Sequence, residues 1–108
     1  MENLETAMGL IAGAGDSRGY CMEAIEYAKS GDFDKAREAI NDAVSAMIDA
    51  HGVQTQLIRE EMEGSGQPVS LLMAHAQDHL NLALIMRDVA EEFIVLYERI
   101  SRLERDEG

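Results

Sequence analysis

One row of regularly spaced side chains near the C-terminus limits the possible folds more than any other feature of the chain. Its members alternate at steps of four and three residues, a spacing that keeps them on one face of an α-helix. The row consists of His75, His79, Leu82, Met86, Val89, Phe93, Leu96, Ile100 and Leu103. It predicts one long helix with a core-facing seam, and it places two histidines at core-like positions near the N-terminal end of that helix.

Two short breaks divide the rest of the chain into helices. Gly31 can take the left-handed conformation that ends a helix, and Asp32 can cap the start of the next one. The segment 63–68 contains two glycines and ends in the only proline, Pro68, which is suited to a first helical turn. Short connections make successive helices antiparallel neighbours, so we expect an all-α, up-down-up three-helix bundle that forms a single domain over residues 1–108. The expected helices span about residues 2–30, 33–63 and 69–104.

The expected second and third helices differ in how much apolar surface they carry. The second helix has one stripe: Phe33, Ala36, Ile40, Ala43, Met47, Ala50, Gln54 and Leu57. The third has a further stripe besides the row above: Met73, Ala76, Leu80, Ala83, Ala90, Ile94 and Tyr97. A helix in a small bundle needs only one apolar face, so two stripes favour an oligomer, although a single wide intramolecular stripe is the alternative. Gly13, Gly15 and Gly19 leave open whether the first helix approaches a neighbour closely, bends or starts late.

The formal net charge of −12 restricts the partners of the protein. Nucleic acids and anionic membrane surfaces are bound by clusters of Lys and Arg, so the charge argues against both. No apolar run approaches the roughly 20 residues of a membrane span, and the acidic start lacks the basic region of a secretory signal. Cys21 is the only cysteine, so no intrachain disulfide forms, and it has no local catalytic signature. These features predict a cytoplasmic protein.

The two histidines of the third helix have the spacing of a helical metal site. His75 and His79 are four residues apart, and Asp78 adds an oxygen ligand. A zinc protease of this kind, however, needs a glutamate directly after the first histidine, where this chain has Ala76. Di-iron bundles need Glu-x-x-His pairs, and no histidine here has a glutamate three residues before it. Metal hydrolysis is therefore poorly supported.

A phosphoryl carrier fits these histidines better. Such a carrier needs one unprotonated imidazole nitrogen, donors for the phosphoryl oxygens and a partner that holds the tautomer, and His75 is the candidate nucleophile. Amide groups of Gln77 and Gln54, and N–H groups of His51 or His79, are the candidate donors. The alternative for His75 is a core histidine whose nitrogens are satisfied within the bundle.

The string His75-Ala76-Gln77-Asp78-His79-Leu80 resembles the active-site motif of one known family. That family comprises the IIA components of the lactose/cellobiose (N,N'-diacetylchitobiose) class of bacterial sugar phosphotransferase systems. The similarity covers about residues 4–103. It includes four shorter patterns: Ala14-Gly15 with Arg18, Gly31-Asp32-Phe33, Ala50-His51 and Gln54-Thr55. Asn81 is a departure, because the family often has methionine at this position.

The resemblance implies a cytoplasmic homotrimer that carries phosphoryl groups. His75 would accept the group from the small phosphocarrier HPr and pass it to a cysteine of the IIB component, for a disaccharide that enters through the membrane component IIC. Asp78 would meet its two symmetry mates at the trimer axis around Mg²⁺ or another divalent cation, because a hard dication relieves the repulsion of clustered carboxylates. Gln77, His79, Gln54 and His51 would support the site. The alternative function is a non-catalytic, metal-binding helical oligomer for assembly or sensing.

Overall fold

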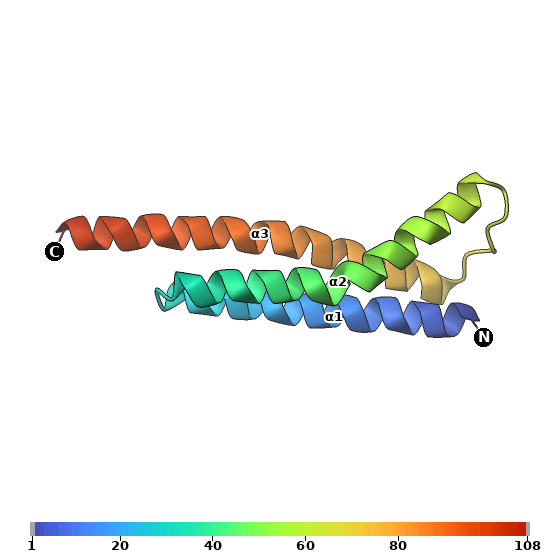
Figure 1. The fold of residues 1–108 in the computed structure, drawn as a ribbon, viewed down its shortest axis with the longest axis horizontal. Helices are drawn as coiled ribbons and strands as arrows, with labels where there is room; N and C mark the ends of the chain where they lie inside the picture. The colour runs from blue at the N-terminus through green and yellow to red at the C-terminus, as the bar shows by residue number, and fades with distance from the viewer. Residues whose placement is uncertain (1, 108) are drawn as a thin grey trace.

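The computed structural model describes residues 2–107 and consists of three long helices (Figure 1). They are α1 (Glu2–Lys29), α2 (Phe33–Met62) and α3 (Leu71–Glu107). No strand is present within residues 2–107. The expected all-α, up-down-up arrangement is confirmed, and the bounds of α1 and α2 lie within one residue of the expected ones.

The turn between α1 and α2 forms as its residue types predict. Gly31 has a positive φ of 82°, the left-handed conformation that costs glycine little. The side chain of Asp32 accepts a hydrogen bond from the backbone N–H of Lys35 at 3.2 Å, which satisfies one of the free donors at the start of α2. This turn therefore reverses the chain within three residues.

The connection between α2 and α3 differs from the expectation. Pro68 does not lie in a first helical turn, because α3 begins only at Leu71. Ser70 takes the capping position instead: its hydroxyl accepts a hydrogen bond from the N–H of Met73, and its carbonyl accepts one from Ala74, both at 3.0 Å. A serine hydroxyl can satisfy a free N–H at a helix start and proline cannot, which explains the later beginning of α3.

Helix α1 lies at the centre of the bundle, and α2 and α3 pack mainly against it rather than against each other. Figure 1 shows the second half of α2 turning away from α1 towards the connection, and the C-terminal part of α3 running beyond the α1–α2 turn. The molecule is accordingly elongated, with extents of 62 × 22 × 20 Å. Part of α3 is left without a covering helix.

Small side chains recur every seven residues along the buried faces of all three helices. The set comprises Ala7, Ala14, Cys21 and Ala28 on α1, Ala36, Ala43 and Ala50 on α2, and Ala76, Ala83 and Ala90 on α3. Small residues in contact positions let helix axes approach closely. Gly13 belongs to the same interface, since a Cβ there would lie 3.2 Å from the carbonyl oxygen of Ala46 and 3.4 Å from the Cβ of Ala50. The role of Gly13, which the sequence left open, is therefore close approach of α1 to α2.

The core is divided into two clusters along the length of α1. One surrounds Cys21 near the α1–α2 turn, and the other surrounds Leu10 and Leu80 near the start of α3. Between Ala14 of one cluster and Cys21 of the other lies Ser17, which is fully buried and whose hydroxyl has no hydrogen-bond partner within residues 2–107. The cluster around Leu80 supports the part of α3 that carries the histidines.

The expected apolar stripe of α2 is confirmed, but the expected core seam of α3 is wrong. On α3 the buried positions belong to the other stripe, including Met73, Ala76, Leu80, Ala83, Ala90 and Ile94. Most of the row of four- and three-residue steps faces outward instead: Leu82, Val89 and Leu96 are 57%, 41% and 50% exposed, while Met86 packs against the edge of a core cluster. The reason is side-chain size: the alanines permit close contact with the small residues of α1, whereas the branched and aromatic side chains do not.

An ion pair joins α2 to α3 near the α1–α2 turn. The Arg37 guanidinium donates two hydrogen bonds to the Glu98 carboxylate, at 2.6 and 3.2 Å. The pKa of Glu98 is lowered, chiefly by the hydrogen bond from Arg37. Both side chains are substantially exposed, so this pair orients the two helices and contributes little to stability.

Candidate functional site

His75 and His79 form a contacting pair on the outer side of α3. Their Nε2 atoms lie 3.1 Å apart, with one ring donating and the other accepting according to the tautomer. The rings meet nearly edge to face, at an interplanar angle of 87°. His75 is exposed and His79 is half-buried, so the core-like positions expected for them are wrong. They belong to the outward row because Ala76 and Leu80 occupy the buried face of the same turn.

Three side-chain amides form a second cluster between α2 and α3. The Gln54 amide nitrogen donates to the carbonyl oxygen of Gln77 at 2.7 Å and to that of Asn81 at 3.2 Å. Gln77 in turn lies with its amide nitrogen 3.7 Å from the Met73 sulfur. The sequence predicted Gln54 and Gln77 as site residues but not Asn81. The sequence signal that could have identified Asn81 is its position four residues after Gln77, about one helical turn along the same face.

The histidine pair and the amide cluster occupy different sides of α3. His75 and Gln77 are two residues apart, which places their side chains roughly 200° apart around the helix. Within one chain, Gln77 therefore does not stand beside the His75 ring. His51 is exposed on α2, and its backbone carbonyl accepts a hydrogen bond from the Thr55 hydroxyl at 3.0 Å. No hydrogen bond among residues 2–107 links the His51 ring to the histidine pair.

Asp78 is exposed and lies one helical turn before a line of apolar side chains on the outer side of α3. Leu82, Ile85 and Val89 follow it at steps of four, three and four residues, and all three are exposed. A carboxylate is the ligand type that Mg²⁺ prefers, but one carboxylate is far short of an octahedral shell. Within residues 2–107 no group of three or more His, Cys, Asp or Glu is arranged to hold a metal ion. Asp78 fits a magnesium site only where several copies of the chain bring their carboxylates together.

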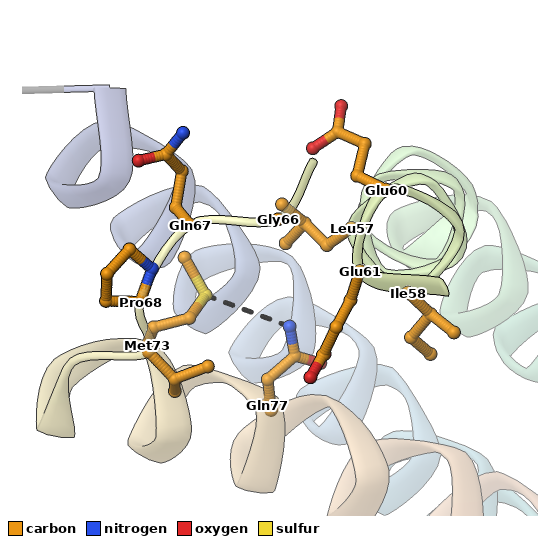
Figure 2. Close-up of a pocket in the computed structure, with 10 residues that line it drawn as sticks. Leu57, Ile58, Glu60, Glu61, Gly66, Gln67, Pro68, Met73 and Gln77 are labelled. Atoms are coloured by element: carbon orange, nitrogen blue, oxygen red, sulfur yellow. Dashed lines mark hydrogen bonds between the residues drawn. The ribbon is translucent and has the colours of Figure 1, made fainter. Parts of the chain in front are cut away.

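A pocket of about 260 Å³ lies beside the amide cluster (Figure 2). The end of α2, the connection and the start of α3 enclose it, and Gln77 and Met73 form its α3 side. Its α2 side includes Leu57, Glu60 and Glu61. The sequence did not predict this pocket, because it depends on the angle at which the end of α2 leaves the bundle. Its lining is mostly apolar, with Gln77, Glu60 and Glu61 among its polar side chains.

The remaining nucleophile, Cys21, does not belong to the site. Its side chain is completely buried in the cluster near the α1–α2 turn. Burial raises the pKa of the Cys21 thiol, and the nearby positive charge of Arg87 opposes this only partly. A buried thiol that keeps its proton is a poor nucleophile.

Comparison with known proteins places this chain in one family. The family model described as "PTS system, Lactose/Cellobiose specific IIA subunit" matches residues 5–98, which include the histidine pair, the amide cluster and Asp78. The chain belongs to this family. It is thus a IIA component of the lactose/cellobiose/chitobiose class and a component of a phosphotransferase, as the His75–Leu80 motif indicated.

Sequence relatives of this IIA component come from several bacteria. It is 46% identical over 92 residues to the lichenan-specific phosphotransferase enzyme IIA component of Bacillus subtilis, covering 85% of this chain and 84% of the relative. It is 38% identical over 96 residues to the N,N'-diacetylchitobiose-specific IIA component of Escherichia coli K12, covering 89% and 83% of the two chains. These relatives serve different sugars, so membership of the family does not identify a substrate.

Solved structures of IIA components share the fold. The cellobiose-specific enzyme IIA from Bacillus anthracis superimposes with a TM-score of 0.89 at 37% identity, covering 94% of both chains. The chitobiose IIA of Escherichia coli, solved in complex with HPr, gives a TM-score of 0.80 at 36% identity, covering 94% of this chain and 98% of that one. Within residues 2–107, this IIA component has no helix long and apolar enough to cross a membrane.

Proposed function

We propose that this IIA component is a cytoplasmic phosphoryl carrier that accepts a phosphoryl group from phosphorylated HPr on His75. It then passes the group to a cysteine of its IIB component, which phosphorylates a disaccharide entering through IIC. The observation that carries the proposal is the exposed His75 ring within the family motif, on a turn of α3 whose Ala76 and Leu80 are buried in the core. The complex of chitobiose IIA with HPr supports the choice of donor.

The proposed transfer exchanges one phosphorus–nitrogen bond for another. An unprotonated His75 nitrogen attacks the phosphorus in line as its bond to the HPr histidine breaks, and that histidine leaves with the electron pair. Attack through Nε2 would bring the phosphoryl group against Nε2 of His79, 3.1 Å away in the free protein, where an N–H can donate to a phosphoryl oxygen. Because such transition states are loose, positioning and charge stabilisation suffice for the protein's part.

In this proposal the amide cluster supports the histidines from a different side of α3. Gln54 bonds to both Gln77 and Asn81, so it ties the diverging half of α2 to the turn of α3 that carries His75 and His79. This cluster holds the helix in position rather than contacting the phosphoryl group within one chain. His51 is exposed on α2, about one helical turn before Gln54, and would contribute to contact with the partner proteins.

The proposal includes assembly as a homotrimer. Exposed apolar side chains along the outer side of α3 supply a hydrophobic surface: Leu82, Ile85, Val89, Leu96 and Leu103. The helix itself runs past the end of the other two helices (Figure 1). Packing three copies along Leu82, Ile85 and Val89 would bring three Asp78 carboxylates together one helical turn before Leu82, where Mg²⁺ or a similar dication would neutralise them. The chain supplies the carboxylate oxygens for that ion.

The carrier function is tested by intact-mass spectrometry. The purified chain is incubated with phosphoenolpyruvate, enzyme I and HPr, and we expect one acid-labile phosphoryl group per chain. Omitting HPr should abolish the adduct, because enzyme I would not transfer directly. Failure to form an adduct while HPr itself is phosphorylated would refute the proposal.

Asp78→Leu tests the proposed ion at the trimer axis. The substitution replaces three repelling carboxylates with apolar side chains, so the trimer should persist and its stability should no longer depend on Mg²⁺. Analytical ultracentrifugation with Mg²⁺ or with EDTA measures the assembly state, and Asp88→Leu on the exposed face of the same helix is the control. Dissociation of the Asp78→Leu protein to monomers would contradict an electrostatically costly position for Asp78.

A further inference from the structure

The arrangement of His75 and His79 has a property that phosphoryl transfer does not require. The two Nε2 atoms lie 3.1 Å apart on the outside of α3, in hydrogen-bonding contact. Two imidazole nitrogens bound to one tetrahedral zinc ion, each at about 2.0–2.1 Å, lie about 3.3 Å from each other. The pair therefore matches the separation of two ligands of a single ion to within a few tenths of an ångström. The rings would give up their mutual hydrogen bond and turn so that both Nε2 lone pairs point at the ion.

We propose that His75 and His79 together form a chelating site for a borderline divalent transition-metal ion such as Zn²⁺, and that this ion excludes the phosphoryl group from His75. Imidazole favours Zn²⁺, Cu²⁺ and Ni²⁺, whereas Mg²⁺ prefers oxygen ligands. This site is thus chemically distinct from the carboxylate site proposed at Asp78.

The helix prepares the pair for chelation. Residues four apart lie one above the other on the helix surface, and both Cβ positions are held by a backbone that Ala76 and Leu80 pack into the core. The backbone therefore loses no further conformational entropy when an ion joins the two rings, and only side-chain torsions become fixed. The exposure of His75 leaves the ion open to water, which would complete its coordination.

Other ligands in the chain do not compete well for such an ion. Cys21 is buried and keeps its proton, and His51 stands on another helix without a histidine four residues away. Because no group of three or more metal-binding side chains occurs within residues 2–107, the pair supplies two ligands rather than a closed shell. The site would therefore bind Zn²⁺ reversibly, as expected of a regulatory site, and would not be a structural zinc centre.

Binding of the ion and phosphorylation use the same electron pair. The Nε2 lone pair of His75 that would coordinate the metal is the one that attacks phosphorus when the reaction proceeds through Nε2, so the two are mutually exclusive. This consequence rests on the proposed carrier function, whereas the metal site itself does not. The inference adds metal-ion inhibition to the carrier.

Isothermal titration with Zn²⁺ tests the site directly. Excess Mg²⁺ is present throughout to occupy carboxylate sites, and the wild-type chain should bind one Zn²⁺ per chain. His75→Ala and His79→Ala should each weaken binding at least about tenfold, because even second-shell partners of a metal commonly matter that much. His51→Ala is the matched histidine control and should bind as the wild type does. Equal affinity in all four proteins, or no binding to the wild type, would overturn the proposal.

Phosphorylation by phosphoramidate, a small chemical donor that needs no partner protein, tests the competition. Zn²⁺ at ten or more times its Kd should slow formation of the acid-labile adduct at least about tenfold, because less than about a tenth of the chains then keep a free His75 lone pair, and EDTA should restore the rate. An unchanged rate in saturating Zn²⁺ would refute the exclusion. A chain that binds Zn²⁺ through both histidines but forms no adduct with phosphorylated HPr, even without metal, would refute the carrier function and leave the metal site established.

Discussion

His75→Ala is expected to eliminate the phosphoryl adduct while the protein keeps its fold. The substitution removes the only nitrogen nucleophile that the proposed reaction uses, so the loss should be complete rather than partial. Intact-mass spectrometry after incubation with phosphoenolpyruvate, enzyme I and HPr measures it. Circular dichroism should be unchanged, because the exposed His75 side chain has the ring of His79 as its hydrogen-bond partner and is absent from both core clusters.

Two further histidine variants make this result specific. His79→Ala should still form the adduct, but more slowly, because it removes a donor beside His75 and leaves the nucleophile in place. His51→Ala lies outside the pair and should form it with the wild-type yield in the presence of ample HPr. A stable adduct on the His75→Ala protein would assign the phosphoryl group to another residue and contradict the proposed site.

Leu10→Ala is expected to cause the largest loss of stability among simple truncations. Leu10 is 1% exposed and is one of the largest fully buried side chains, packed in the cluster that also contains Leu80. Truncating a buried leucine removes apolar contacts and leaves a cavity, which typically costs about 3–5 kcal/mol. Most neighbouring core residues are alanines that cannot reach into the space, so the cavity should close poorly.

Urea denaturation at a fixed protomer concentration measures this loss, since assembly makes apparent stability depend on concentration. Leu4→Ala is the matched control: the same substitution on the same helix, at a side chain that is 52% exposed, should change the free energy of unfolding by about 0.5 kcal/mol or less. Equal effects of the two substitutions would contradict the burial of Leu10 in a packed core.

The candidate site was largely predictable from local spacing. Residues three and four apart on a helix must be neighbours, so the contact between His75 and His79 follows from the helix alone. The same reasoning places the side chains of Gln77 and His75 on different sides of the helix, although the two residues are close in the sequence. Membership of the family, indicated by the string from His75 to Leu80, is confirmed by the match over residues 5–98.

The outward direction of the histidines could not be obtained from hydrophobicity. Both stripes of α3 are apolar and helically spaced, and the more regular one was expected to face the core. The structure buries the stripe that contains Ala76, Ala83 and Ala90, because these small residues fit against those of α1. Side-chain volume, matched between helices at intervals of seven residues, was the informative signal.

The sequence by itself determined three helices, the turn at Gly31 and Asp32, the identity of the motif and the contact between its histidines. All of these depend on backbone conformation or on neighbours within one helical turn. Tertiary structure decided which stripe of α3 is buried, how Gln54 joins Asn81, and where the divergence of α2 leaves a pocket. These depend on how side chains from separate helices fill a shared volume, which the spacing along any single helix does not specify.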